Sequence, residues 1–398
     1  MHRFGSFRRS RERLIPMTVA MLLFLQLALI YGCRDSGHMN TTFDEVPGNS
    51  EQGAMFRADP QRTGVYPNSG KIPEGEYLWK IGDDGWNYPK IKAPVFSDGN
   101  IYFAGWLSRY VFAVDALSGE EIWRFDSAGP ETVITGYPLI AGEALFCCDS
   151  TGTIYALNKA TGKEVWRFGT DNGPILSPLI VNGIVYFGSY DNNFYALDAK
   201  SGEPLWRYDA GAPILSSPAA YKETIVFGSG DKEFECSLHA LDMMSGKETW
   251  RISVGRTFNL TPCISSGLVF YGDDIGIMHA VAIDTGKEKW NFPTGGFISS
   301  SPAVDNTVLY FGSYDGYIYA LEAETGRELW RFRVGDKISF GSPSIADGVV
   351  YIGSDGQYIY ALDAHTGNEL WRLYAGIDLR GSPCIINGIV YFEVGAIK

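Results

Sequence analysis

Two adjacent pairs of side chains could do chemistry in this sequence. Cys147 and Cys148 could form a vicinal disulfide in an exported protein. Asp273 and Asp274 form an acidic pair, and carboxylate oxygens are ligands that hard cations such as Ca²⁺ prefer. The chain has no CxxC, GxSxG or HExxH motif, and its five His do not cluster. We therefore predict no catalytic residue and no metal site, with the acidic pair serving as solvated turn carboxylates.

A repeat of about 40 residues must position these pairs. The sequence is rich in residues that suit strands and turns, with 14% aromatic residues and 47 Gly. Eight Trp follow a Gly turn at spacings of 40 to 44 residues, and eight Pro each begin a repeat. The two series are Trp79, Trp123, Trp166, Trp206, Trp250, Trp290, Trp330 and Trp371, and Pro94, Pro138, Pro178, Pro218, Pro262, Pro302, Pro343 and Pro383.

One repeat predicts the whole fold. Residues 301–332 contain four short strand patterns separated by Gly and Asx turns, expected at 301–304, 308–312, 317–322 and 328–332. Alternating side chains bury both faces of such a sheet between its neighbours. We expect the recurrent Trp to be a wedge in the core between blades. The prediction is an all-β, eight-bladed β-propeller of four-stranded antiparallel blades.

The order of the repeat marks predicts how the ring closes. Trp79 precedes the first Pro, and no Trp follows Pro383, so 76–81 would add an outer strand to the blade that the C-terminal residues begin. Joining N- and C-terminal strands in one blade removes exposed sheet edges. The third strand of that blade has no C-terminal match. Either 53–57 supplies it, which we favour, or the chain is truncated.

The N-terminus is predicted to be an export signal. A basic stretch (2–13) is followed by an apolar run (15–31) and then Gly32-Cys33. Residues 30–33 resemble a bacterial lipobox, which implies lipidation of Cys33 and a membrane-anchored lipoprotein on the periplasmic side of the envelope. A plain signal or an uncleaved anchor is the alternative. The predicted domains are a signal peptide (1–33), a flexible tether (34–52) and the propeller (53–398).

The charge balance narrows the class of partner. The formal net charge is −13, and the first 32 residues contribute +4, so the rest of the chain carries −17. An acidic surface repels phosphate backbones, and we expect no nucleic-acid partner. We expect a monomeric propeller.

The repeat also resembles a known family. Residues 195–202 (YALDAKSG) with Trp206-Arg207, and residues 360–367 (YALDAHTG) with Trp371-Arg372, are similar to the PQQ-like propeller repeat. The resemblance covers about residues 76 to 398. The family includes quinoprotein dehydrogenases and the non-catalytic lipoprotein of the β-barrel assembly (Bam) complex.

The resemblance gives the cysteine pair a possible role. Quinoprotein alcohol dehydrogenases place a vicinal disulfide above PQQ, whereas Cys147-Cys148 ends a second strand and so departs from their pattern. We interpret the two cysteines as replacements for the Gly-Ser of other repeats, such as Gly188-Ser189. No motif resembles the family's Ca²⁺ ligands or catalytic Asp. PQQ and Ca²⁺ are therefore expected only under the alternative of a PQQ-dependent oxidoreductase.

Longer loops lie on one predicted face, and we expect function there. Residues 378–382 (DLRGS) look like the Leu-Arg-Gly loop through which the Bam lipoprotein contacts its barrel-forming partner, which implies that Leu379, as an exposed anchor, and Arg380 touch a partner. Further aromatic and basic candidates on that face are Trp106, Arg109, Arg256 and Phe258.

The favoured function is a non-enzymatic exported scaffold that presents its loop face to an envelope or outer-membrane protein, with outer-membrane protein assembly as a role that it could serve. The alternatives are the PQQ-dependent oxidoreductase and a propeller that binds a glycan or small ligand.

Overall fold

The computed structural model describes Asp59 and residues 91–392, apart from 106, 107, 117, 119, 128, 130, 131, 174, 231–235, 256–260, 340, 377, 380, 387 and 388. All of these residues belong to one compact unit, Val46–Lys398. The predicted signal peptide with Cys33, the tether and the N-terminal closing strands lie outside the described residues. The described part contains no helix whose length and hydropathy would let it span a bilayer.

Seven sheets of four strands follow one another along the described chain, each antiparallel and hydrogen-bonded in chain order. The first three are β1 (Ile91–Ser97), β2 (Asn100–Gly105), β3 (Tyr110–Asp115) and β4 (Glu121–Asp126); β5 (Leu139–Ala141), β6 (Ala144–Cys148), β7 (Thr153–Asn158) and β8 (Glu164–Gly169); and β9 (Leu179–Val181), β10 (Ile184–Gly188), β11 (Asn193–Asp198) and β12 (Pro204–Asp209).

The fourth and fifth sheets are β13 (Ala219–Tyr221), β14 (Thr224–Gly230), β15 (Cys236–Asp242) and β16 (Glu248–Gly255), and β17 (Cys263–Ser265), β18 (Leu268–Gly272), β19 (Ile277–Ala282) and β20 (Glu288–Pro293). The sixth and seventh are β21 (Ala303–Asp305), β22 (Val308–Gly312), β23 (Tyr317–Glu322) and β24 (Glu328–Arg333), and β25 (Ser344–Ala346), β26 (Val349–Gly353), β27 (Tyr358–Asp363) and β28 (Glu369–Tyr374). A two-stranded sheet follows, with β29 (Cys384–Ile386) and β30 (Ile389–Tyr391).

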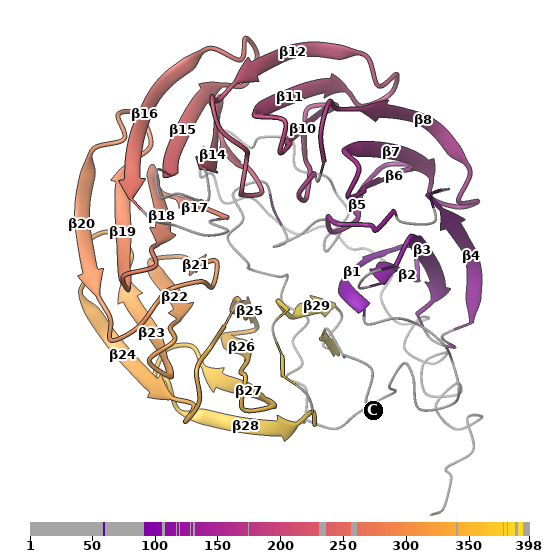
Figure 1. The fold of residues 1–398 in the computed structure, drawn as a ribbon. Helices are drawn as coiled ribbons and strands as arrows, with labels where there is room; N and C mark the ends of the chain where they lie inside the picture. The colour runs from indigo at the N-terminus through magenta and orange to yellow at the C-terminus, as the bar shows by residue number, and fades with distance from the viewer. Residues whose placement is uncertain are drawn as a thin grey trace, which may run out of the picture. The chain divides into compact units, whose positions relative to one another are not determined.

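The first strands of neighbouring sheets contact one another around a ring, as Figure 1 shows. Strand β29 contacts both β25 and β1, so the two-stranded sheet lies between the seventh sheet and the first. The fold is therefore a β-propeller. The two-stranded sheet occupies the place of the predicted eighth blade, and the residues predicted to complete that blade lie outside the described ones.

The predicted strands of the sixth repeat match the structure closely. The second and third expected strands coincide with β22 and β23, and the fourth extends one residue further, to Arg333. The first strand starts two residues later than expected, at Ala303. The two-residue turn before β22 places Asn306 at φ 54°, in the left-handed region that Asx side chains tolerate.

The recurrent Trp is a wedge between blades, as predicted. The indole Nε1 of Trp290 donates to the carbonyl of Ala323 in the next sheet at 3.0 Å. A Cβ placed on Gly326, in the turn that follows, would lie 2.7 Å from the ring of Trp290. Only Gly fits there, because its φ is also +73°. The same pairing joins Trp123 to Gly162, Trp166 to Gly202, Trp206 to Gly246, Trp250 to Gly286 and Trp330 to Gly367.

Trp371 departs from this pairing. Its indole Nε1 is buried without a hydrogen-bond partner. In the earlier sheets the acceptor is a carbonyl after the third strand of the next sheet, and the sheet that follows Trp371 has only two strands among the described residues.

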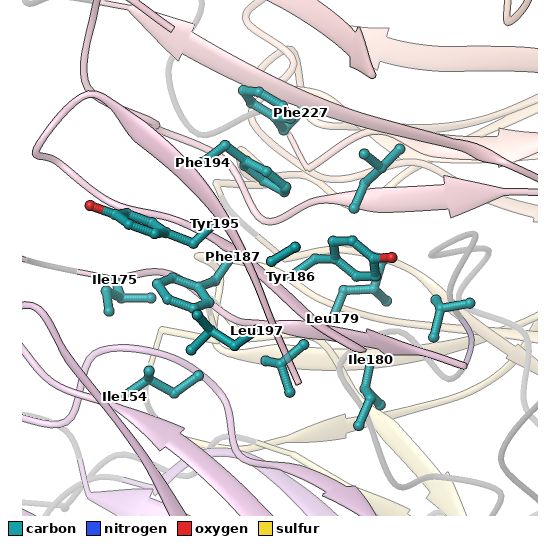
Figure 2. Close-up of a cluster of buried hydrophobic side chains, with 14 of the residues drawn as sticks. Ile154, Ile175, Leu179, Ile180, Tyr186, Phe187, Phe194, Tyr195, Leu197 and Phe227 are labelled. Atoms are coloured by element: carbon teal, nitrogen blue, oxygen red, sulfur yellow. The ribbon is translucent and has the colours of Figure 1, made fainter. Parts of the chain in front are cut away.

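The core lies between the sheets. Figure 2 shows one cluster that fills the space on both sides of the third sheet and includes Tyr186 and Phe187 of that sheet, Ile154 of the second and Phe227 of the fourth. These side chains are at most 1% exposed, as expected for aromatic and aliphatic residues on both faces of a sheet enclosed by two neighbours.

Candidate functional site on the loop face

Two kinds of connection share one face of the ring. They are the loops between the second and third strand of each sheet and the loops between sheets, and together we call them the loop face. The opposite face carries the tight turns, such as the one with Gly183 at φ +74°. The loop face is the place where the structure offers long and variable backbone.

In six loops between sheets, all within the described part of the chain, one buried aliphatic residue fixes the loop. The backbone N–H of Ile298 donates to the carbonyl of Asp273 at 3.0 Å, and a Cβ on Gly272 would lie 2.3 Å from the side chain of Ile298. Ile214 and Ile338 occupy the same position against Gly188 and Gly312. The small residue that ends each second strand makes room for this anchor.

Leu379 is one of these anchors. Its backbone N–H donates to the carbonyl of Ser354 at 3.3 Å, and its side chain packs over Gly353. Leu379 is 1% exposed, so the exposed anchor expected from the sequence is instead buried in its own propeller. The sequence did not indicate this role because Leu stands where five other repeats carry Ile.

The acidic pair serves the loop in which it lies. Asp273 is 6% exposed, and one of its oxygens accepts hydrogen bonds from the N–H groups of Ile275 and Ile277. The other oxygen lies 3.1 Å from Nε2 of His279. Asp273 is therefore a buried, hydrogen-bonded loop former and not the solvated carboxylate that the sequence suggested, while Asp274 is half-buried. Asp149, at the same position in the second sheet, also binds its own loop and Tyr155.

Cys147 and Cys148 do not fit a vicinal disulfide beside a quinone. They pair in register with Tyr155 and Ile154, and consecutive residues of a strand point to opposite faces of the sheet. Both are free, fully buried thiols in different hydrophobic layers. Burial raises the pKa of each well above its ordinary value.

The register also corrects the interpretation of the cysteines. In the paired second and third strands, Cys148 stands where Gly188 does and Cys147 stands where Phe187 does. The pair therefore replaces an aromatic-Gly step and not the Gly-Ser step expected from the sequence.

The structure describes only one of the other partner contacts that the sequence predicts. Arg109 is partly exposed, forms an ion pair with Asp126 at 2.9 Å and lies over the ring of Tyr110. Trp106, Arg256, Phe258 and Arg380 lie outside the described residues.

Ser229, His239 and Glu248 lie in an order that resembles a nucleophile, a base and an acid. Ser229 Oγ is 2.7 Å from His239 Nε2, and His239 Nδ1 is 3.5 Å from Glu248. However, Ser229 is 3% exposed and His239 is fully buried, so a substrate has no access to the hydroxyl. Burial is the main cause that lowers the pKa of His239 to about 4. This is a core hydrogen-bond network.

The described residues contain no group of three or more His, Cys, Asp or Glu that could hold a metal ion. The loop face does expose large apolar side chains at one place. Ile275 is 70% exposed and Phe297 is 54% exposed, and the ring of Phe297 lies 5.6 Å from that of half-buried Tyr314. We call these three residues the Phe297 surface.

The Phe297 surface was missed at the sequence level. Neither Ile275 nor Phe297 is among the partner contacts that the sequence predicts. Comparing repeats would have found it, because Ile275 stands where the third sheet has Asp191 and the sixth has Asp315.

Comparisons with known proteins agree with the fold. The chain resembles BamB from Moraxella catarrhalis at 20% identity and a TM-score of 0.64, over 80% of this chain and 95% of that one. It also resembles a europium-containing methanol dehydrogenase at 13% identity and a TM-score of 0.67, over 84% and 87% of the two chains. A quinohemoprotein alcohol dehydrogenase from Comamonas testosteroni matches at 15% identity and a TM-score of 0.67, over 84% and 75%.

At these identities the solved structures support the fold alone. No curated protein matches the sequence significantly. The family model described as outer membrane protein assembly factor BamB matches residues 108–270, 233–313 and 274–391, which together span most of the chain. The protein therefore belongs to the family of outer membrane protein assembly factor BamB.

Proposed function

We propose that this propeller is a non-enzymatic scaffold of the cell envelope, exported and lipid-anchored through Cys33, that binds a protein partner with its loop face during outer-membrane protein assembly. The observation that carries the proposal is the Phe297 surface, because large apolar side chains exposed on a loop face are typical of a protein interface. Membership of the BamB family supports the role in assembly.

The chemistry of the loop face supports a binding role. The oxygens of Asp149 and Asp273 already accept hydrogen bonds within the propeller. The thiols of Cys147 and Cys148 are buried on opposite faces of a sheet. None of these groups faces a site where a reacting molecule would meet it.

The candidate contacts from the sequence enter this proposal. Arg109 would contact the partner from the first sheet, together with Trp106 beside it in the chain. Arg256, Phe258 and Arg380 would contribute from two other loops between sheets, and Leu379 would anchor the loop that carries Arg380.

A cross-linking scan tests the proposal. A photoreactive amino acid is placed at exposed loop-face positions (Asp171, Asp378) and at exposed positions of the opposite face (Lys200, Asp284), and intact cells are irradiated. We expect adducts with an envelope protein from the loop-face positions and none from the turns. Adducts of equal yield from both faces, or from the turns alone, would contradict the proposal.

A second measurement tests the enzymatic alternative. The purified protein is titrated with PQQ with and without Ca²⁺ and then assayed for dye reduction with simple alcohols and sugars. We expect neither calcium-dependent binding nor turnover. Binding with turnover would replace the scaffold by an oxidoreductase.

A further inference from the structure

The Phe297 surface is built from loops that brace one another. The backbone N–H of Tyr314 donates to the carbonyl of Phe297 at 2.9 Å. The backbone N–H of Thr294 donates to the carbonyl of Gly276 at 2.7 Å, and the Thr294 hydroxyl lies 2.8 Å from the carbonyl oxygens of both Gly276 and Gly296, which joins the loop of Ile275 to the loop of Phe297. A rigid apolar platform loses little conformational entropy when a partner binds.

Folding does not require the apolar character of these positions. The residue before the buried anchor is Phe297 in this loop, but it is Val133, Pro213, Lys337 and Asp378 in the corresponding loops of other sheets. Ile275 likewise corresponds to Thr151 and Asp191. The propeller thus accepts charged and polar residues at the same backbone positions, and the exposed Phe and Ile serve something outside the fold.

The charge of the loop face limits what can bind there. In its described loops, nine Asp stand against two basic residues, Arg109 and Lys337. Asp336 is exposed near the Phe297 surface, and Lys337 lies over the ring of Tyr314, with Nζ 5.5 Å from the ring centre. Acidic loops attract basic groups and repel acidic chains and anionic lipid headgroups.

We infer that the Phe297 surface docks an extended polypeptide segment that carries both basic and apolar side chains. Its apolar residues pack on Ile275 and Phe297, and its Lys or Arg residues face the surrounding carboxylates or lie over an aromatic ring, as Lys337 already does. This inference rests on the proposed scaffold function and names the region and the chemistry of the partner.

A binding assay with defined probes tests the chemistry. The purified protein is titrated with a short synthetic peptide of alternating lysine and leucine and, separately, with the matching glutamate–leucine peptide. We expect only the lysine–leucine peptide to bind, with an affinity that falls as salt rises. Equal binding of both peptides, or binding of neither, would overturn the inference.

Matched variants test the place. Phe297→Lys introduces the residue that the next loop carries at this position, Lys337, so the variant should fold. Val133→Lys introduces a lysine at the corresponding position of another loop. We expect Phe297→Lys to lower the affinity for the lysine–leucine peptide about tenfold and Val133→Lys to change this affinity less than about twofold. Equal losses would show that net charge alone governs binding.

Cross-linking in intact cells separates this inference from the proposed function. A photoreactive residue at position 297 should yield an adduct whose cross-linked peptide contains Lys or Arg together with apolar residues, and one at position 133 should yield less. If other loop-face positions cross-link and 297 does not, the scaffold function stands and the Phe297 surface is not the docking site. If no loop-face position cross-links, both are wrong.

Discussion

The loop face of the second and third sheets and that of the fifth and sixth share their buried loop residues but differ in the residues that they expose. Both use a small residue at the end of the second strand, a buried aliphatic anchor and a carboxylate that caps its own loop. At the position of exposed Ile275 in the fifth sheet, the second sheet carries exposed Thr151, whereas the third and sixth sheets carry half-buried Asp191 and Asp315. The residues at buried positions are constrained by the fold, whereas an exposed position such as that of Ile275 can carry a residue that serves binding.

The two regions also differ beneath these loops, in the third strands of the sheets. Tyr195 of the third sheet stacks on Phe187, and its hydroxyl donates to Asp191 at 2.6 Å. In the fifth sheet His279 takes this position, stacks on Tyr271 and lies between Asp273 and Glu288. The same stacking geometry therefore holds a neutral phenol in one region and an imidazole between two carboxylates in the other.

The largest expected effect tests whether the two regions share one scaffold. Gly202→Ala and Gly326→Ala each place a Cβ 2.7 Å from a Trp ring at a positive φ. We expect each to lower the free energy of unfolding by about 2–4 kcal/mol, measured by urea unfolding. Gly183→Ala is the control, because its φ is similar but no atom lies within 4 Å. A large effect in one region only would show that the two regions do not share one scaffold.

The next effect concerns two histidines with opposite pH dependence. Burial lowers the pKa of His239 to about 4, below the ordinary 6.5, so its folded state takes up a proton less readily than the unfolded chain. The stability that neutral His239 contributes is lost as the pH falls below 6.5. Between pH 7 and pH 5 we expect a loss of about 1–2 kcal/mol, which His239→Tyr should remove.

His279 should behave in the opposite way. Burial opposes its charge, but hydrogen bonds to Asp273 and Glu288 outweigh burial and raise its pKa above 6.5. Its contribution is fully present below pH 6.5 and is lost as the pH rises through the raised pKa. When the pH is lowered from 8 to 5, the urea midpoint of His279→Tyr should fall relative to that of the wild type. The urea midpoint of His239→Tyr should rise relative to that of the wild type over the same range. Shifts of the same sign would contradict this assignment.

The smallest effect is expected where the two regions differ most visibly. Ile275→Thr gives the fifth sheet the residue that the second carries as Thr151, and Ile275 is 70% exposed. We expect a change in unfolding free energy within about 0.5 kcal/mol. A loss above about 1 kcal/mol in urea unfolding would mean that the apolar residue serves the fold after all.

Most of the fold could be predicted from the sequence because each blade repeats the same local rules. Gly and Asx turns bounded strands such as 308–312 and 317–322, and the Trp spacing predicted the wedges between blades. Each repeat supplied independent support for the same assignment.

The candidate site was harder to predict because its features depend on contacts across loops. Leu379 resembled an exposed interface residue until its backbone bond to Ser354 identified it as an anchor. The cysteine pair was placed one residue off because only the strand register separates Phe187-Gly188 from Gly188-Ser189. The exposure of Phe297 follows from the way two loops fold against each other, which periodicity does not report.

The central claim is that the Phe297 surface binds a protein during outer-membrane protein assembly. The most direct test replaces the chromosomal copy with Phe297→Lys or with the matched control Val133→Lys, and measures the amount of folded β-barrel protein in the outer membrane at equal levels of both propellers. The account predicts a clear reduction for the first variant and the wild-type amount for the control. Equal amounts in the two strains would contradict it.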